Sequence, residues 1–180
     1  FPKIQLEPDL QMDVEQIALG TFSPLEGFMG KEDVQSVLFD MRLIPRSGRT
    51  QATGVVWPIP IVLDVDEEKA KPLSLGGDVA LTDSNGTIVA VLHLEEKYRY
   101  DRNVFAEKMY GTTDKRHPGV RAVQQMKPVF LGGKVTLLTR RPAPYKGYEL
   151  TPAQVRRIFA ERGWSRVVGF HTRNVPHRGH

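Results

Sequence analysis

The chain contains no cysteine, no apolar run long enough to cross a membrane and no signal-peptide pattern at its start. Disulfides and thiolate chemistry are therefore excluded. Of its 180 residues, 40% are hydrophobic and 26% are charged, which are ordinary proportions for a globular protein. These totals favour a cytoplasmic protein with one medium domain, or with one small domain and part of another.

The formal charge of +4 is unevenly distributed along the chain. Residues 140–180 carry nine Lys and Arg against two acids, whereas the preceding 139 residues carry 16 basic and 19 acidic residues. Such a concentration of positive charge is typical of a segment that binds an anionic ligand or nucleic acid. A solvated basic helix face would produce the same count.

Two helices are predicted near the start of the chain. Apolar side chains recur at helical spacing over residues 9–19, and Gly20 is a suitable helix end. Residues 31–42 predict a second helix, with one apolar face formed by Val34, Val37, Leu38 and Met41.

The middle of the chain is predicted to be β-rich. Residues 57–65 and 132–138 have the composition of strands, and the apolar runs 78–83 and 87–96 flank Asn85-Gly86. Asn-Gly between two apolar runs predicts a β-hairpin, because both residues tolerate positive φ. Short strands and tight turns indicate a small, strongly bent sheet or barrel.

The pattern changes to that of an α/β protein after residues 141–150, which are rich in proline and glycine and predict a linker. Thr151 to Gln154 form a capping-box helix start with proline at the first helical position. The helix is expected to bury Val155, Ile158 and Phe159 and to end at Gly163. Residues 166–170 then predict a strand of a parallel sheet, buried on both faces.

The fold class expected from these patterns is α+β. A β-rich domain would span residues 1–140, and residues 151–180 would form the first helix–strand–loop unit of a larger α/β domain that extends beyond them.

Polar residues with the chemistry of an anion site follow the strand predicted at 166–170. In open α/β sheets, ligands bind beyond the carboxyl ends of the strands. A helix beginning near His177 would bring His177 and His180 onto one face and direct free N–H groups at a phosphate. Arg173 offers a planar fork suited to phosphate or sulfate, and Asn174 offers a neutral donor.

Other interpretations of this segment stay open on residue types alone. His171, His177 and His180 could chelate a metal, although no carboxylate or cysteine is nearby. A basic tail that binds nucleic acid and an inert solvated tail are also possible. A nucleotide-phosphate site is the interpretation that the residues favour.

Three motifs in the same order together resemble the ATP sulfurylase (sulfate adenylyltransferase) family. They are GTFSPLEGFM at 20–29, YGTTDKRHPGV at 110–120 followed by FLGGKV at 130–135, and HTRNVPHRGH at 171–180. The resemblance implies a PUA-like N-terminal domain over residues 1–140 and the beginning of a Rossmann-like nucleotidyltransferase domain. Within the first two motifs, the side chains of SPLEGFM are expected to pack in the core. Asp114 and Pro118-Gly119 are expected to form a turn, and residues 95–102 a solvated surface.

The resemblance also implies an activity, in which MgATP and sulfate give adenosine 5′-phosphosulfate and pyrophosphate. Catalysis would be carried by Arg173, Asn174, His177 and His180. Contacts to sulfate and the ATP phosphates would come from these four together with His171, Thr172 and Gly179. No protein metal ligand is implied, and Mg²⁺ would arrive with ATP.

The family resemblance further implies a homo-oligomer and allows an adenylylsulfate kinase domain elsewhere in the protein. The lack of a long apolar run argues against a membrane partner, and basic residues without interleaved aromatics argue against nucleic acid. Two alternatives remain, namely a PUA-like module that binds RNA and an H-x-G-H nucleotidyltransferase with another acceptor. The sequence departs from the family pattern at His171, where glutamine is usual, and at Val175, where proline is usual.

Overall fold

The computed structural model describes residues 1–44, 54–142, 145–175 and 177–179. Its elements in chain order are β1 (Lys3–Gln5), α1 (Pro8–Leu19), β2 (Gly27–Phe28), α2 (Lys31–Asp40), β3 (Leu63–Val65), α3 (Glu67–Ala70), β4 (Asp78–Thr82), β5 (Ile88–Tyr98), α4 (Arg102–Tyr110), α5 (Pro118–Gln125), β6 (Val129–Leu137), the 3₁₀ turn η1 (Lys146–Tyr148) and α6 (Pro152–Glu161).

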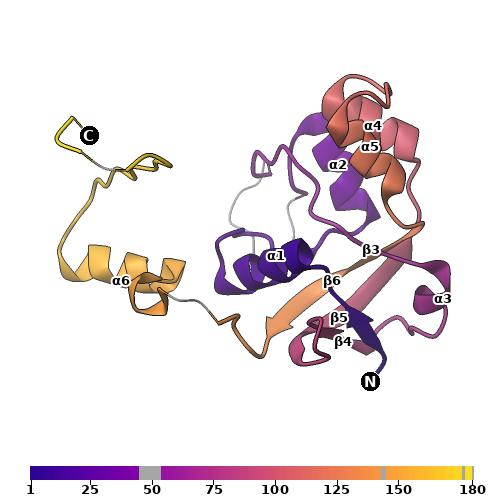
Figure 1. The fold of residues 1–180 in the computed structure, drawn as a ribbon, viewed down its shortest axis with the longest axis horizontal. Coiled ribbons are helices and arrows are strands. Elements are labelled where there is room, and N and C mark those ends of the chain that lie inside the picture. The colour runs from indigo at the N-terminus through magenta and orange to yellow at the C-terminus, as the bar shows by residue number, and fades with distance from the viewer. Residues whose placement is uncertain (45–53, 143–144, 176, 180) are drawn as a thin grey trace.

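The six strands of the described residues form one mixed sheet, in which five follow the order β1-β4-β5-β6-β2 and the sixth, β3, pairs with β6. Only β1 and β4 pair in parallel, and the remaining pairs are antiparallel. One edge of β6 pairs with β5, and its other edge pairs with β3 near Leu131 and with β2 near Gly133. The long strands β5 and β6 therefore organise the sheet (Figure 1).

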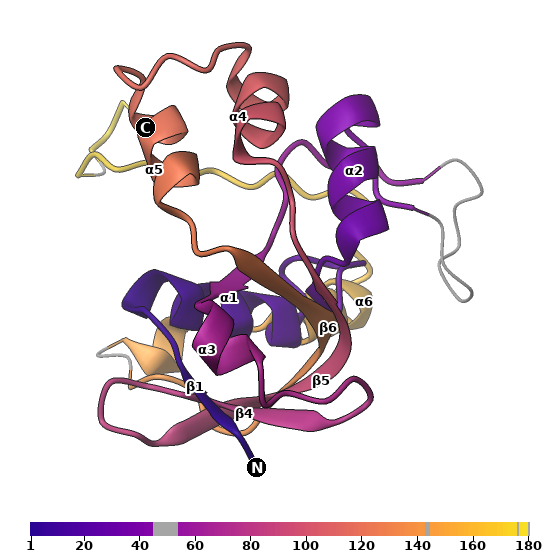
Figure 2. The same ribbon diagram turned by 90° about the vertical axis from the view of Figure 1, so that its right-hand side faces the viewer.

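Two hydrophobic clusters hold this sheet to its helices. In the first, Val14 and Ile17 of α1 pack with Leu81, Leu92 and Leu131 of the sheet. The second joins α2, α4 and α5 to the end of the sheet through Val34, Phe105, Val120, Val123, Tyr98 and Phe130. Figures 1 and 2 both show these three helices gathered at one end of β5 and β6, whereas α1 lies beside β6.

The expected hairpin and the first two helices are confirmed. The chain turns between β4 and β5 with Gly86 at φ +82°, and the Asp83 carboxylate accepts from the N–H groups of Asn85 and Thr87 at 2.9 and 2.8 Å. Helix α1 ends at Gly20, whose φ is +85°. Helix α2 buries Val34, Val37 and Leu38 as expected.

Two expectations about residues 31–65 are wrong in part. Met41 was predicted on the buried face of the second helix, but it follows the end of α2 with φ +51° and is 60% exposed. Of the strand predicted at 57–65, only Leu63–Val65 forms. Pro58 and Pro60 have no N–H to donate, which keeps the earlier part of this segment out of the ladder.

The segment expected to be a solvated surface at 95–102 is a structural junction instead. It contains the end of β5, and Tyr98 is only 7% exposed, with its hydroxyl donating to the Met29 carbonyl at 2.8 Å. Burial of this phenol raises its pKa. Asp101 then caps α4 by accepting from the N–H groups of Asn103 and Val104.

The expected turn at Pro118-Gly119 is the first turn of α5. His117 is the N-cap of this helix, and its Nδ1 accepts from the Gly119 N–H at 3.2 Å. The N–H of the first helical residue has no hydrogen-bond partner within the helix, so a proline there costs nothing. Pro118 is therefore compatible with a helix start as well as with a turn. Asp114 does accept from Arg116, as a turn residue would, and this ion pair lowers the pKa of Asp114.

The motif at residues 20–29 serves packing, as predicted. Leu25, Phe28 and Met29 are each less than 5% exposed. The backbones of Gly27 in β2 and Gly133 in β6 approach so closely that a Cβ on Gly27 would overlap the Gly133 carbonyl oxygen. The motifs at 20–29 and 130–135 are thus two sides of one strand pair.

Replacing Gly27 with Ala is expected to lower the free energy of unfolding by about 3 kcal/mol, because β2 must move away from β6 to admit the methyl group. Gly147→Ala is the matched control, since a Cβ at Gly147 meets no atom within 4 Å. Its effect should stay within about 0.5 kcal/mol. Urea unfolding of the two variants measures both values, and equal stabilities would contradict the close-approach argument.

Candidate functional site

The helix before the candidate site begins as its sequence predicts. Thr151 Oγ1 accepts from the Gln154 N–H at 3.3 Å, and Gln154 Oε1 accepts from the Thr151 N–H at 2.8 Å. This capping box starts α6 (Pro152–Glu161), and Gly163 follows it with φ +64°. The polar segment therefore follows a helix whose start and end are both explained by local sequence.

The predicted burial of α6 is wrong in this structure. Val155, Ile158 and Phe159 are half-buried, and no residue of α6 is fully buried. Local stacking replaces a core, because Phe159 lies 6.2 Å from the Trp164 ring and the Arg162 guanidinium lies 4.9 Å from the same ring.

The strand predicted at 166–170 is not formed. Residues 165–171 belong to no strand or helix, and Val168 and Phe170 are 93% and 70% exposed. A strand is stabilised by the backbone of a neighbouring strand, and no described strand is paired with this segment. The apolar residues that suggested a doubly buried strand consequently face solvent.

The predicted site residues lie on an exposed segment beyond this point. His171, Arg173, Asn174, His177 and Gly179 are exposed, and Thr172 is half-buried. His180 and Pro176 lie outside the described residues, so the expected pairing of His177 with His180 is not described. The helix expected near His177 is a turn at residues 178–179.

Two side chains of the segment bind its own backbone. Thr172 Oγ1 accepts from the Asn174 N–H at 3.0 Å, and His177 Nδ1 accepts from the Gly179 N–H at 3.1 Å. His117 makes the same contact with Gly119 at the start of α5. In a neutral imidazole whose Nδ1 accepts, the ring proton lies on Nε2.

The electrostatics of the segment suit an anion. Residues 162–180 contain four arginines and no acid. Within the part of the chain that the structure describes, no group of three or more His, Cys, Asp or Glu could hold a metal ion. The same residues include no helix long and apolar enough to cross a membrane.

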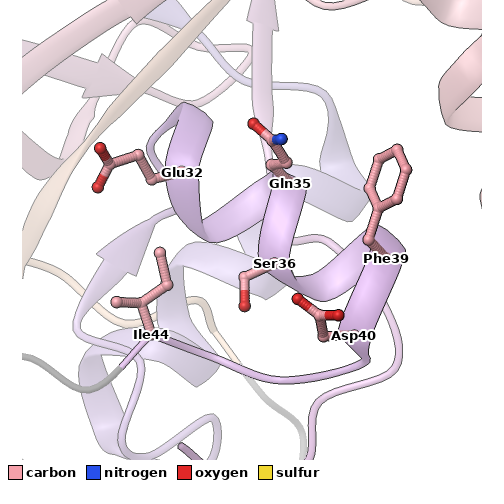
Figure 3. A pocket seen from close by; sticks show the side chains of 6 residues that line it. All are labelled: Glu32, Gln35, Ser36, Phe39, Asp40 and Ile44. Atoms are coloured by element: carbon pink, nitrogen blue, oxygen red, sulfur yellow. The ribbon is translucent and has the colours of Figure 1, made fainter.

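A surface depression of about 390 Å³ lies elsewhere, along α2. Figure 3 shows its lining, which comes from Glu32, Gln35, Ser36, Phe39 and Asp40 of α2 together with Ile44. Two carboxylates and no cation line it, so it would repel sulfate or a nucleotide phosphate. The charge of residues 162–179 suits an anion, and the lining of this depression does not.

Two polar clusters were not found from the sequence. His93 bridges three strands, with Nδ1 2.7 Å from Asp78 Oδ1 and Nε2 2.8 Å from Thr136 Oγ1. Glu15 of α1 binds Arg140 and Arg141 after β6. Neither cluster has a local sequence signature, because its members meet only through strand register or helix packing.

Comparisons with known proteins match two parts of the chain to two family models. Residues 1–140 match the model of the PUA-like domain family, and residues 146–180 match the ATP-sulfurylase family model. A solved structure named "Hexameric APS kinase from Thiobacillus denitrificans" superposes with a TM-score of 0.63 at 24% identity, over 92% of this chain and 27% of that chain. That likeness concerns the fold alone.

Curated relatives match over the whole length of this chain. Sulfate adenylyltransferases of Symbiobacterium thermophilum and Nostoc punctiforme are 45% and 44% identical over 100% of it, and that of a Synechococcus strain is 46% identical over 99%. The chain spans 44% of the length of each of these relatives. The PUA-like family model matches residues 1–140, the ATP-sulfurylase family model matches residues 146–180, and the curated relatives match the whole chain. The chain therefore belongs to the ATP sulfurylase family.

Proposed function

We propose that this chain supplies the PUA-like domain and an anion-binding segment of an enzyme that transfers the adenylyl group of MgATP to sulfate. A sulfate oxygen attacks the α-phosphorus, the bond from the α-phosphorus to the bridging oxygen breaks, and pyrophosphate leaves with its electron pair. The observation that supports this most is the acid-free, arginine-bearing segment 162–179 inside the region that matches the ATP-sulfurylase family model.

The residues of the segment divide the work of binding two anions. The planar guanidinium of Arg173 binds two of the four sulfate oxygens and turns one of the other two toward the α-phosphorus. His171, where the family usually has glutamine, can donate to the same anion. Thr172 holds the Asn174 N–H at 3.0 Å and so fixes the backbone between Arg173 and Asn174, leaving the Asn174 amide to donate to phosphate.

The histidines face the charge that develops on the leaving pyrophosphate. His177 donates from Nε2 because Gly179 occupies its Nδ1, and Gly179 lets a phosphate approach the backbone. His180 is assigned to the same oxyanion as His177. Donors held in place before the reaction stabilise such charge without reorganisation, which makes positioning and electrostatics the sources of catalysis. The segment offers cationic and amide donors and no carboxylate, so Mg²⁺ enters bound to the ATP phosphates.

The proposal includes a Rossmann-like arrangement for residues 151–180, with 1–140 as the PUA-like domain and 141–150 as the linker. The exposed Val168 and Phe170 support it, because an apolar segment of this kind is stabilised when it becomes an inner strand of a covered sheet. A cytoplasmic location and a homo-oligomeric assembly also remain parts of the proposal.

In the full-length protein, replacing both His177 and His180 with Ala should lower sulfate-dependent ATP–pyrophosphate exchange by about a hundredfold or more, since two donors to the leaving group are lost. Arg121→Ala is the control, because Arg121 is exposed on α5 and lies outside the anion-binding segment. Circular dichroism should be unchanged in both proteins. Full exchange in the double variant would contradict the assigned roles.

The acceptor is tested in the same assay with molybdate and phosphate beside sulfate. Strong exchange with phosphate and none with sulfate would indicate a nucleotidyltransferase for another acceptor. Tight RNA retention on filters with a steep salt dependence, in a protein without exchange, would instead indicate a nucleic-acid-binding module.

The tautomer of His177 is open to direct measurement. At pH 8, where imidazole is ordinarily neutral, His177 and His117 should carry the ring proton on Nε2, because each Nδ1 accepts a backbone N–H. His93 is the internal control, since its Nδ1 faces the Asp78 carboxylate and must carry the proton there. Long-range ¹H–¹⁵N NMR correlations distinguish the two tautomers. An Nδ1–H signal for His177 would remove the proposed Nε2 donor.

A further inference from the structure

Glu15 is a buried carboxylate at the point where the chain leaves the PUA-like domain. Its side chain is only 6% exposed, although it belongs to the surface helix α1. Arg140 Nε donates to Glu15 Oε1 at 2.9 Å, and the backbone N–H of Arg141 donates to Oε2 at 3.1 Å. Arg141 Nε adds a longer contact to Oε2 at 3.3 Å. Both carboxylate oxygens therefore hold the two residues that lead out of β6.

The charged form of Glu15 is the form that these contacts stabilise. Burial alone would raise the pKa of the carboxyl group, but the hydrogen bonds and charges of Arg140 and Arg141 outweigh burial and lower it. A lowered pKa means that the interaction contributes stability above the unfolded pKa of about 4.3 and is lost as pH falls through the folded pKa. The contact is thus complete at neutral pH.

Arg140 extends the contact across the linker. Its Nη2 donates to Glu149 Oε2 at 3.0 Å while its Nε binds Glu15, so one guanidinium joins α1 to a residue two positions before the N-cap of α6. Just upstream, the N–H groups of Leu138 and Thr139 donate to the Val89 carbonyl at 2.8 and 3.0 Å. The chain is therefore hydrogen-bonded to the sheet at residues 138–139, and the Arg140–Glu149 ion pair joins the two ends of the linker.

We propose that Glu15 is a positioning residue that sets the course of the linker, acting through Arg140 on Glu149. The linker starts beside α1 and β6 and leads to α6, so this bridge sets the direction from which the second region departs (Figure 1). A guanidinium suits this bridge, because its planar fork directs Nε at Glu15 and Nη2 at Glu149 at the same time. The proposal stands on these contacts alone and does not depend on the adenylyl-transfer activity.

The alternative is that Glu15 only attaches α1 to the sheet. Limited trypsin digestion of the full-length protein separates the two, with cleavage after Arg140 and Lys146 quantified by mass spectrometry and thermal unfolding measured in parallel. The variants are Glu15→Gln, Glu149→Gln and the pair together. Glu67→Gln is the matched control, because Glu67 also pairs with an arginine, Arg99, but on the exposed surface.

Glu15→Gln should raise cleavage in the linker by roughly tenfold and lower the melting temperature, because it removes a buried charged partner. Glu149→Gln should raise the same cleavage by roughly threefold with an unchanged melting temperature, since its contact is exposed and lies outside the domain. The double variant should be cleaved no faster than Glu15→Gln alone, because both carboxylates act through Arg140.

Two results would overturn the proposal. Cleavage after Arg116, which lies outside the linker, serves as the reference for general unfolding. If Glu15→Gln lowers the melting temperature and raises cleavage in the linker and after Arg116 by the same factor, Glu15 only attaches α1 to the sheet. If Glu149→Gln leaves cleavage unchanged, or if the two effects multiply in the double variant, Arg140 does not transmit the contact. Glu67→Gln should alter neither measurement.

Discussion

The pairing of β5 with β6 is the constraint on which the other parts of the fold depend. Among the strands that the structure describes, β6 alone pairs with β5 along one edge and with both β2 and β3 along the other. Successive residues of β6 face opposite sides of the sheet, so Leu131 enters the cluster beneath α1 and Phe130 enters the cluster beneath α2, α4 and α5. A displacement of β6 would thus disturb both clusters together. The close pairing of β5 with β6 also requires glycine at position 133, because a Cβ there would overlap the His93 carbonyl of β5.

The same strand fixes where the second region begins. β6 ends at Leu137, the next two N–H groups bind Val89 of β5, and Glu15 then receives Arg140 and Arg141. Helix α1 can supply that carboxylate only because Val14 and Ile17 pack it into the first cluster. Core packing and the course of the linker are therefore consequences of one arrangement, with α1 held against β6.

Features with local causes were predictable from the sequence. The hairpin at Asn85-Gly86 and the helix ends at Gly20 and Gly163 depend on residues that tolerate positive φ, and the capping box at Thr151 depends on four adjacent residues. Tyr98 was missed because the register of β5 shifts between Leu94 and Glu96, which breaks the two-residue alternation by which a strand is recognised. The Glu15–Arg140 contact joins residues 125 apart, and no pattern in one sequence reports such a pair.

For the candidate site, the sequence reports the charge of the segment but not its geometry. An apolar run such as 166–170 predicts a strand only on the assumption that partner strands exist, and no described strand pairs with it. The charges need no such assumption. In residues 140–180, Arg140 and Arg141 both pair with Glu15, Arg140 also pairs with Glu149, and Arg157 pairs with Glu161. Both acids of that stretch are thus engaged before residue 162, and every charged residue that follows is an arginine. The ion pairs that order the linker and α6 therefore leave the positive potential concentrated on the segment proposed to bind sulfate and ATP.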